Sequence, residues 1–318
     1  MNKKLFLPAM MLAVAFASCN NEENPTMAES RTALGVNVQL EEMSRAMVSG
    51  QALSDDDPIG VFVVASDYSN SDGKATGYSN VSYKGTTTGG TQKWGPSTVG
   101  TEVLLSGTQG KVFAYYPWTD GIADYQAIPV DITEQKDWMY SEEEGPVNDA
   151  APNVSFNLKH AQTAVNVKVV RDASYTGAGA ISALTVTSEG LASSGKLNAS
   201  DGAFADVTGA NTAISVANAF TLVADDASTT DVKENEKENP YMFIPASTAV
   251  KDFTVNATID GKPYKVAVTM SEAFKAGFIY KVAVKISNVG LTIDSVVIVE
   301  PWSELDLPEG TLQPGTGA

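Results

Sequence analysis

The most regular feature of the chain is an alternation of apolar and polar residues with a period of two. Residues 165–169, 253–259 and 280–287 each place an apolar side chain at every second position, with Thr, Asn, Lys, Ser or, at position 283, Ala between them. Successive side chains of a β-strand point to opposite faces of the sheet. The pattern therefore predicts three half-buried antiparallel strands, each with its polar face toward solvent.

Turn residues separate these segments from their neighbours. Asp260-Gly261 lies between two apolar segments and fits a type I′ turn, which needs positive φ at both positions, so a hairpin is predicted there. Gly, Pro, Asn, Asp and Ser clusters likewise separate strand-like runs in the first half, and helical periodicity is hard to find anywhere. The runs cover residues 33–40, 59–65, 78–84, 102–105 and 111–116.

This spacing predicts an all-β chain, and two β-sandwiches fit it best. With 318 residues and 43% hydrophobic residues, the chain has enough apolar material for two cores. We place an N-terminal sandwich at residues 33–150 and a C-terminal sandwich with a C-terminal strand or tail at residues 151–318. The boundary follows from the acidic, proline-containing stretch at 141–153, for which a long surface loop is the alternative.

The N-terminus has the organisation of an export signal. Lys3 and Lys4 precede an apolar run at residues 5–17, and small residues follow. At ~1.5 Å per residue this run covers about 20 Å, less than the ~30 Å of a bilayer core, so it is not a stable span. Residues 1–18 are therefore predicted to be a signal peptide.

The only cysteine of the chain, Cys19, follows this signal directly. An odd cysteine in a secreted protein requires an explanation. The sequence before it resembles a bacterial lipobox, in which the cysteine is lipidated and becomes the new N-terminus, although Phe16 stands where an aliphatic residue is usual. The alternative is an ordinary signal peptide with a leftover thiol. Residues 19–32 are polar and are predicted to be a flexible tether.

The chain carries a formal net charge of −17, and loss of residues 1–18, with two lysines and no acids, gives −17 − 2 = −19. Such a chain is repelled by phosphate backbones and by anionic lipid. Nucleic acid is therefore not expected as a partner.

Catalytic or metal-binding chemistry finds little support in the sequence. The one histidine, His160, has no nucleophile motif beside it, so a packed structural role is favoured, and one His with one Cys does not make a zinc site. The acidic clusters at residues 55–57 and 142–144 are predicted to be solvated loops, with a Ca²⁺ site at the first as a weaker alternative. We expect no cofactor and no enzymatic activity.

Aromatic residues gather in and around the segment KVFAYYPW, at residues 111–118. Phe113 and Tyr115 share one face of a predicted strand, so core packing is favoured. A glycan-binding face is the alternative.

Several landmarks occur in one order along the chain. They are Cys19, SRA at 44–46, DPIGVFV at 57–63, VFAYYPW at 112–118, WMY at 138–140, VSFNLKHAQTAVNVKV at 154–169, YMFIPAS at 241–247, KAGFIYKVAVKI at 275–286 and PW at 301–302. Together they resemble the fimbrillin (Mfa-like) family of Bacteroidetes, the subunits of type V pili. The acidic residues after Cys19 also resemble the signal by which lipoproteins of these bacteria reach the cell surface.

The resemblance implies two transthyretin-like antiparallel Greek-key β-sandwich domains in tandem and a structural role. It also implies an assembly route: a lipidated outer-membrane precursor reaches the cell surface, and proteolysis after an arginine removes the first strand. A strand of the next subunit then fills the emptied groove. By position the matching residue is Arg45, whereas a cut after Arg31 would leave residues 33–40 in place.

The donor strand implied by this route is best sought at residues 291–299, with Leu291, Ile293, Val296 and Ile298 as its apolar positions. The same segment is equally suited to be the last strand of its own domain. In that case the chain would be a tip or accessory subunit that accepts a strand without giving one.

The expected partners are thus other fimbrial subunits, host or bacterial surface ligands, and the outer membrane through the lipid on Cys19. The expected location is the cell surface and then the fimbrium. A lipid-anchored glycan-binding module and, more remotely, a glycoside hydrolase with a carboxylate pair remain as alternatives.

Overall fold

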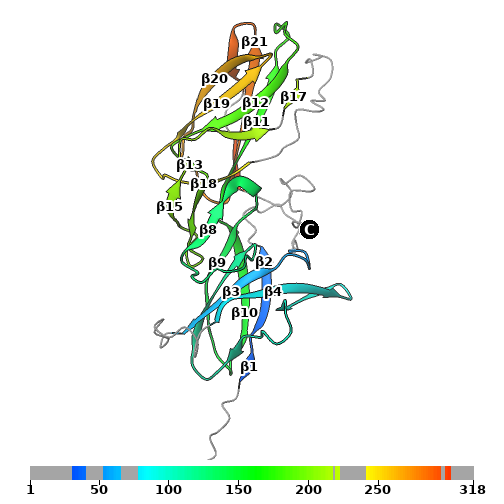
Figure 1. The fold of residues 1–318 in the computed structure, drawn as a ribbon, viewed down its shortest axis with the longest axis vertical. Helices are drawn as coiled ribbons and strands as arrows, with labels where there is room; N and C mark the ends of the chain where they lie inside the picture. Colours follow the sequence, from blue (N-terminus) through cyan, green and yellow to red (C-terminus); the bar gives the residue numbers. More distant parts are fainter. Residues whose placement is uncertain are drawn as a thin grey trace, which may run out of the picture.

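A computed structural model describes residues 31–40, 53–65, 78–217, 219–222, 241–294 and 298–301 of the chain. Strands dominate these residues, and the short 3₁₀ turn η1 (Ile132–Glu134) is the only helical element among them. Within the same residues, no helix is long and apolar enough to cross a membrane. The molecule is thus nearly all-β, as predicted, and its two halves lie end to end (Figure 1).

The N-terminal half is a closed barrel in the order β10-β2-β5-β4-β3-β7-β9. All neighbours pair antiparallel except β10 and β2, which run parallel. The strands are β2 (Gly35–Leu40), β3 (Ile59–Ala65), β4 (Tyr78–Thr88), β5 (Thr91–Pro96), β7 (Gly110–Tyr116), β9 (Met139–Val147) and β10 (Asn153–His160). The expected antiparallel sandwich is therefore replaced here by a barrel, because β2 enters between β5 and β10 and joins the two open edges of the sheet.

The C-terminal half consists of two facing sheets. The first has the order β13-β18-β11-β21-β22, with β23 also on β21, and the second the order β16-β12-β19-β20, with β17 on β12. Strands β11 and β21 run parallel, since a long crossover connection separates them, which corrects the expectation that residues 165–169 and 280–287 form antiparallel strands. The strands of the first sheet are β13 (Leu191–Ala192), β18 (Tyr241–Pro245), β11 (Thr163–Arg171), β21 (Phe278–Ser287), β22 (Gly290–Ile293) and β23 (Ile298–Pro301). Those of the second sheet are β16 (Ile214–Ala217), β17 (Phe220–Thr221), β12 (Ala180–Thr187), β19 (Asp252–Ile259) and β20 (Lys262–Thr269). Alternate residues of both sheets meet in one core.

A third, smaller sheet joins the halves. It has the order β15-β14-β8, in which β8 (Ile128–Asp131) comes before the barrel strands β9 and β10, and β14 (Ser194–Leu197) and β15 (Phe204–Thr208) come after them. Short β1 (Thr32–Ala33) pairs with β6 (Leu104–Leu105) at the far end of the barrel (Figure 1).

The acidic stretch at 141–153 differs from its prediction as a loop or boundary, because most of it lies in β9. Ser141 and Val147 are buried, Glu142 is exposed, and register shifts against β7 accommodate the irregular sequence. Strand β10, which the boundary at residue 150 assigns to the C-terminal unit, pairs with β2 and β9. Strand pairing thus favours a division after His160, and the division into two domains stays a proposal.

The predicted hairpin at Asp260-Gly261 is confirmed, since β19 pairs with β20 and φ is 50° at Asp260 and 74° at Gly261. The Asp260 carboxylate also accepts hydrogen bonds from Gly179 N (3.0 Å), Tyr175 Oη (2.8 Å) and Ala180 N (2.8 Å). These donors lower the pKa of Asp260, the backbone N–H of Gly179 most of all. The carboxylate thereby fixes the loop between β11 and β12 to the hairpin.

Asp260→Asn is predicted to remove part of the acid sensitivity of the fold. Because the folded-state pKa of Asp260 lies below its unfolded value, its contribution to stability is present above the unfolded pKa and is lost as pH falls through the folded pKa. Urea unfolding from neutral to acidic pH should therefore show a shallower decline in the variant. Asp252→Asn, at an exposed position of the preceding strand β19, removes a carboxylate that accepts none of these hydrogen bonds and is the control; equal slopes for D260N and wild type would contradict the assignment.

Candidate functional site

Strand β2, which closes the barrel between β5 and β10, is called the seam strand. Its backbone pairing with these two neighbours is very unequal. It pairs with β10 over six positions, from Gly35 opposite Asn153 to Leu40 opposite Leu158. On its other edge, the described residues pair it with β5 at a single position, Val36 opposite Trp94. The backbone of β2 therefore depends mainly on β10.

Strand β10 in turn depends on β2 for its backbone pairing. Strand β9 pairs with β10 only at Lys159 and His160 among the described residues, so residues 153–158 of β10 have their registered partner in β2. Buried backbone groups need hydrogen-bond partners. Loss of β2 would leave this part of β10 with an open edge.

Side chains of the β2 segment complete the barrel core. Leu34 and Val38 are each only 6% exposed, and Val36 and Leu40 pack against the same cluster from partly buried positions. Asn37 and Gln39 point to solvent. Every second side chain of this segment thus fills the barrel, as the alternation of the sequence requires.

The slot that holds these side chains is strongly apolar. Its opposite surfaces belong to the same barrel cluster, with Val154, Phe156 and Leu158 on β10 and Tyr83 and Trp94 on β4 and β5. Without β2, this cluster would be exposed beside the open edge of β10. A row of free backbone groups above apolar pockets is the surface to which another extended strand adds.

Val38→Asp is predicted to destabilise the barrel by about 3–5 kcal/mol, since it places an unpaired carboxylate in the apolar slot. Urea unfolding of the chain without its signal peptide measures the loss. Asn37→Asp introduces the same group one residue away on the solvent face and should change stability by less than about 0.5 kcal/mol. Equal effects of the two substitutions would show that β2 is not seated in the barrel as described.

The predicted processing residues have different places in the chain. Cys19 and Arg45 lie outside the described residues. Arg31 is exposed and immediately precedes β1, so a cut after it would leave both β1 and β2 attached. A cut after Arg45 falls beyond the last residue of β2, Leu40.

The predicted donor segment lies within its own sandwich. Leu291 and Ile293 belong to β22, and Ile298 belongs to β23; both strands pair antiparallel with β21. Val296 lies outside the described residues. The structure thus shows the second of the two arrangements that the sequence allowed, in which this segment closes its own domain.

Two of the aspartates at residues 55–57 make hydrogen bonds within the barrel. Asp55 accepts hydrogen bonds from Thr87 N (2.6 Å), Thr87 Oγ1 (2.9 Å) and Gln92 Nε2 (3.0 Å), and the bond from Gln92 contributes most to its lowered pKa. Asp57 accepts from Ser54 N (3.0 Å) and Tyr116 Oη (3.3 Å), while burial raises its pKa. No group of three or more potential metal ligands occurs in the part of the chain that the structure describes.

The glutamates at residues 142–144 lie on β9 and not in a loop. Lys159 Nζ is 3.0 Å from Glu142 Oε1 across the β9–β10 pair. Burial raises the pKa of Glu144, and the nearby charge of Glu142 adds to this effect. On this face of the strand, the positive charge of Lys159 thus compensates the negative charge of Glu142.

His160 lies at the junction of the two halves, at the end of β10. Its Nδ1 atom is 3.1 Å from Oδ1 and 2.9 Å from Oδ2 of Asp137, and both side chains are buried. Gln162, also buried, accepts a hydrogen bond from Trp138 N (2.8 Å) through Oε1. The structure thus places His160 in a buried polar cluster, in line with the structural role that the sequence favours.

His160→Leu is predicted to cost about 3–5 kcal/mol, because it leaves the Asp137 carboxylate buried without its partner. The double variant His160→Leu/Asp137→Leu should lose less stability than this single variant, since no charge then remains unpaired. Urea denaturation of the two variants measures the difference. A double variant that is less stable than the single one would contradict the predicted coupling.

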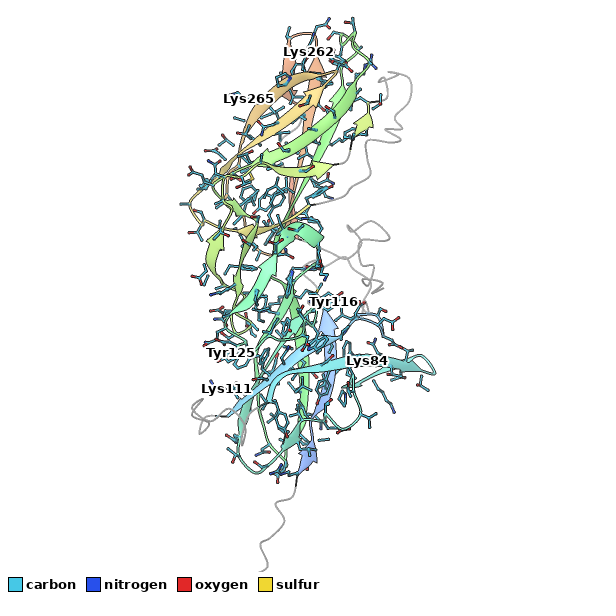
Figure 2. The ribbon with its side chains drawn as sticks, viewed as in Figure 1. Lys84, Lys111, Tyr116, Tyr125, Lys262 and Lys265 are labelled. Carbon is cyan, nitrogen blue, oxygen red and sulfur yellow. The ribbon has the colours of Figure 1, made fainter. Side chains whose placement is uncertain are left out.

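Aromatic residues of the KVFAYYPW segment pack in the core, as predicted. Phe113 stacks on Tyr125 with ring centroids 4.2 Å apart, and Tyr115 stacks on Trp138 at 6.3 Å. Burial raises the pKa of Tyr115 to about 12. Tyr116 faces the barrel interior, and Tyr125 covers the outer face of β7 (Figure 2). Strand β7 is therefore buried on both faces, a feature that simple alternation does not reveal.

The comparisons with known proteins agree with this architecture. A model of the fimbrillin-like family matches residues 44–302. Among curated proteins, no match to this chain is found.

Three solved structures share the fold. A proposed cell adhesion protein of Bacteroides uniformis is 22% identical with a TM-score of 0.59, covering 86% of this chain and 98% of the other. One of Bacteroides ovatus is 16% identical with a TM-score of 0.57, covering 86% and 99%. A fimbrial protein of Bacteroides vulgatus is 15% identical with a TM-score of 0.50, covering 86% and 100%.

Proposed function

Because the chain belongs to the fimbrillin-like family, we propose that it is a structural subunit of a cell-surface fimbria that assembles by strand exchange. The observation that carries the proposal is the seam strand β2. It fills an apolar slot through alternate side chains, is tied mainly to one neighbour, and ends before Arg45. Membership of this family supports a non-enzymatic role in general.

The proposed precursor is exported by residues 1–18, lipidated on Cys19 and anchored in the outer membrane. Cleavage after Arg45 then removes the lipid together with β1 and β2, whose last residue is Leu40. One cut thus couples release from the anchor to opening of the barrel. A cut after Arg31 would achieve only the first of these.

The opened slot is proposed to accept an extended strand from another subunit. Such a strand satisfies the free edge of β10 and, with apolar residues at every second position, replaces Leu34, Val36, Val38 and Leu40. Backbone pairing supplies affinity, while the alternate pockets fix the register.

The donor is proposed to be the segment with Leu291, Ile293, Val296 and Ile298. Donation requires its release from β21, with which β22 and β23 pair in the free chain. A chain that keeps these strands in place would accept a strand without giving one. A tip or accessory subunit of a fimbria would behave in this way.

Strand capture by the cleaved protein tests this function. The chain without its signal peptide is cut by a trypsin-like protease, the N-terminal fragment is removed, and a labelled peptide of residues 33–42 is added. We expect the peptide to bind the cut protein and to remain unbound with uncut protein, because only the cut opens the slot. Anisotropy and size-exclusion chromatography follow the complex.

Two matched variants and a peptide control sharpen the test. Arg45→Gln should prevent both the cut and capture, Arg31→Gln should leave both intact, and the peptide with Val38→Asp should not bind. A cut protein that fails to capture the wild-type peptide would overturn the proposal. If the cut protein captures the peptide, its own oligomeric state distinguishes the two roles. A ladder of oligomers indicates a stalk subunit that donates a strand, and a monomer indicates a tip subunit that only accepts one.

A further inference from the structure

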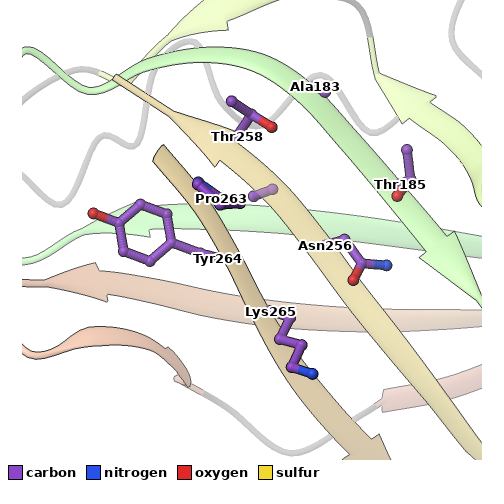
Figure 3. A pocket seen from close by; sticks show the side chains of 8 residues that line it. Ala183, Thr185, Asn256, Thr258, Pro263, Tyr264 and Lys265 are labelled. Atoms are coloured by element: carbon purple, nitrogen blue, oxygen red, sulfur yellow. The ribbon is translucent and has the colours of Figure 1, made fainter. Parts of the chain in front are cut away.

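A hollow of about 350 Å³ opens on the solvent face of the C-terminal sheet β12-β19-β20 (Figure 3). It lies in the half of the molecule that does not contain β2 (Figure 1). It is lined by Ala183, Thr185, Asn256, Ala257, Thr258, Pro263, Tyr264 and Lys265, of which all but Ala257 and Tyr264 lie on the solvent face of the sheet. We call this feature the sheet hollow.

Strand register explains why these six side chains gather. Thr185, Asn256 and Lys265 are direct partners across the three strands. Ala183, Thr258 and Pro263 form the next row, two residues along. Since residues two apart share a face of a sheet, both rows project to the same side.

The opposite face of these strands packs into the sandwich core. Leu184, Val255 and Ala257, which alternate with the hollow residues, are all buried, and Tyr264 packs against the same core from a partly buried position. In Figure 3 the Tyr264 ring points away from Lys265. The hollow is therefore lined by small and polar side chains rather than by an aromatic platform.

The polar groups of the sheet hollow are available to a ligand. Asn256 Nδ2 donates to Thr187 Oγ1 (3.2 Å), which leaves Asn256 Oδ1 as an acceptor. Among the described residues, the Lys265 ammonium and the hydroxyls of Thr185 and Thr258 make no side-chain hydrogen bond or ion pair. One oriented acceptor, two hydroxyls and one cation thus surround a space that also has apolar edges at Ala183 and Pro263.

We propose that the sheet hollow binds a sugar acid, a saccharide of one or two rings that carries a carboxylate. Ring hydroxyls would donate to Asn256 and exchange hydrogen bonds with Thr185 and Thr258, while the carboxylate accepts from Lys265. Carbon-bound hydrogens of the ring would contact Ala183 and Pro263. The volume is at the lower end of the ~300–1,000 Å³ found for small-molecule sites, which fits a ligand of this size.

The ammonium of Lys265, and not the net charge of the chain, argues for an acidic rather than a neutral sugar. The chain has a net charge of −17 and repels anions in general, so a carboxylate needs a local cation, which Lys265 supplies. The contact is exposed to solvent, and such pairs strengthen binding by only about 2–5-fold. Binding of a single sugar is therefore weak and belongs in the range that NMR titration measures.

Two-dimensional NMR of the uncleaved, labelled chain tests the proposal without any need for strand exchange. Glucuronate, galacturonate and N-acetylneuraminate are titrated against glucose, galactose and N-acetylmannosamine. At least one acid should shift resonances of β12, β19 and β20 at lower concentration than its neutral counterpart. Lys265→Met should weaken binding of that acid roughly 2–5-fold, the equivalent of the exposed ion pair, and leave the neutral sugar unchanged.

Lys262→Met is the matched control, because Lys262 lies on the same strand but does not line the hollow (Figure 2). It should bind as the wild type does. The near-isosteric Asn256→Asp should weaken the acid more than the neutral sugar by adding a like charge. Three outcomes would overturn the proposal: no shifts in the hollow with any acid, equal binding of acids and neutral sugars, or equal losses for Lys262→Met and Lys265→Met.

Discussion

The N-terminal half of the molecule depends on one strand pairing, the parallel contact of β2 with β10. Six consecutive residues of β10 have their registered partner in β2, and Leu34 and Val38 fill the core behind it. Closure by this pairing covers residues 153–158 of β10, so among the described residues that part of β10 offers no open edge to another strand while β2 is in place. The same closure makes the barrel sensitive to any cut between Leu40 and the start of β3. In the proposed assembly route, stability before cleavage and strand acceptance after it would have one structural origin.

The C-terminal half is coupled to this barrel through packing and through a small polar cluster. Phe62, Phe113 and Tyr115, on the outer face of the barrel, belong to the same buried cluster as the core of the sandwich. The sheet β15-β14-β8 adds backbone pairing across the junction, and Asp137, His160 and Gln162 occupy the point where β10 ends and β11 begins. Strand β2 pairs with residues 153–158 of β10, before this junction begins at His160. Loss of β2 is therefore not expected to disturb the sandwich.

Local patterns predicted the parts of the fold that depend on neighbours in sequence. Strict alternation located β19 and β21, and Asp260-Gly261 identified the hairpin turn. Closure by β2 was not predicted, because a parallel partner 118 residues distant at Gly35 and Asn153 leaves no local signal. The acidic stretch 141–153 was predicted to be a boundary or a loop because its polar residues suggest one, whereas residues 141–147 lie in β9, with Ser141 and Val147 buried. The sheet hollow likewise depends on the register of three strands, and alternation alone shows only that its side chains face solvent.

Hydrogen–deuterium exchange of the β10 amides tests most directly whether β2 is the removable closing strand. In the uncut chain, amides within residues 153–158 should be protected by β2. After cleavage at Arg45 and removal of the N-terminal fragment, these amides should exchange faster while those of β19 and β21 keep their protection, and addition of the 33–42 peptide should restore the slow exchange. Unchanged protection of residues 153–158 after removal of β2 would contradict the account.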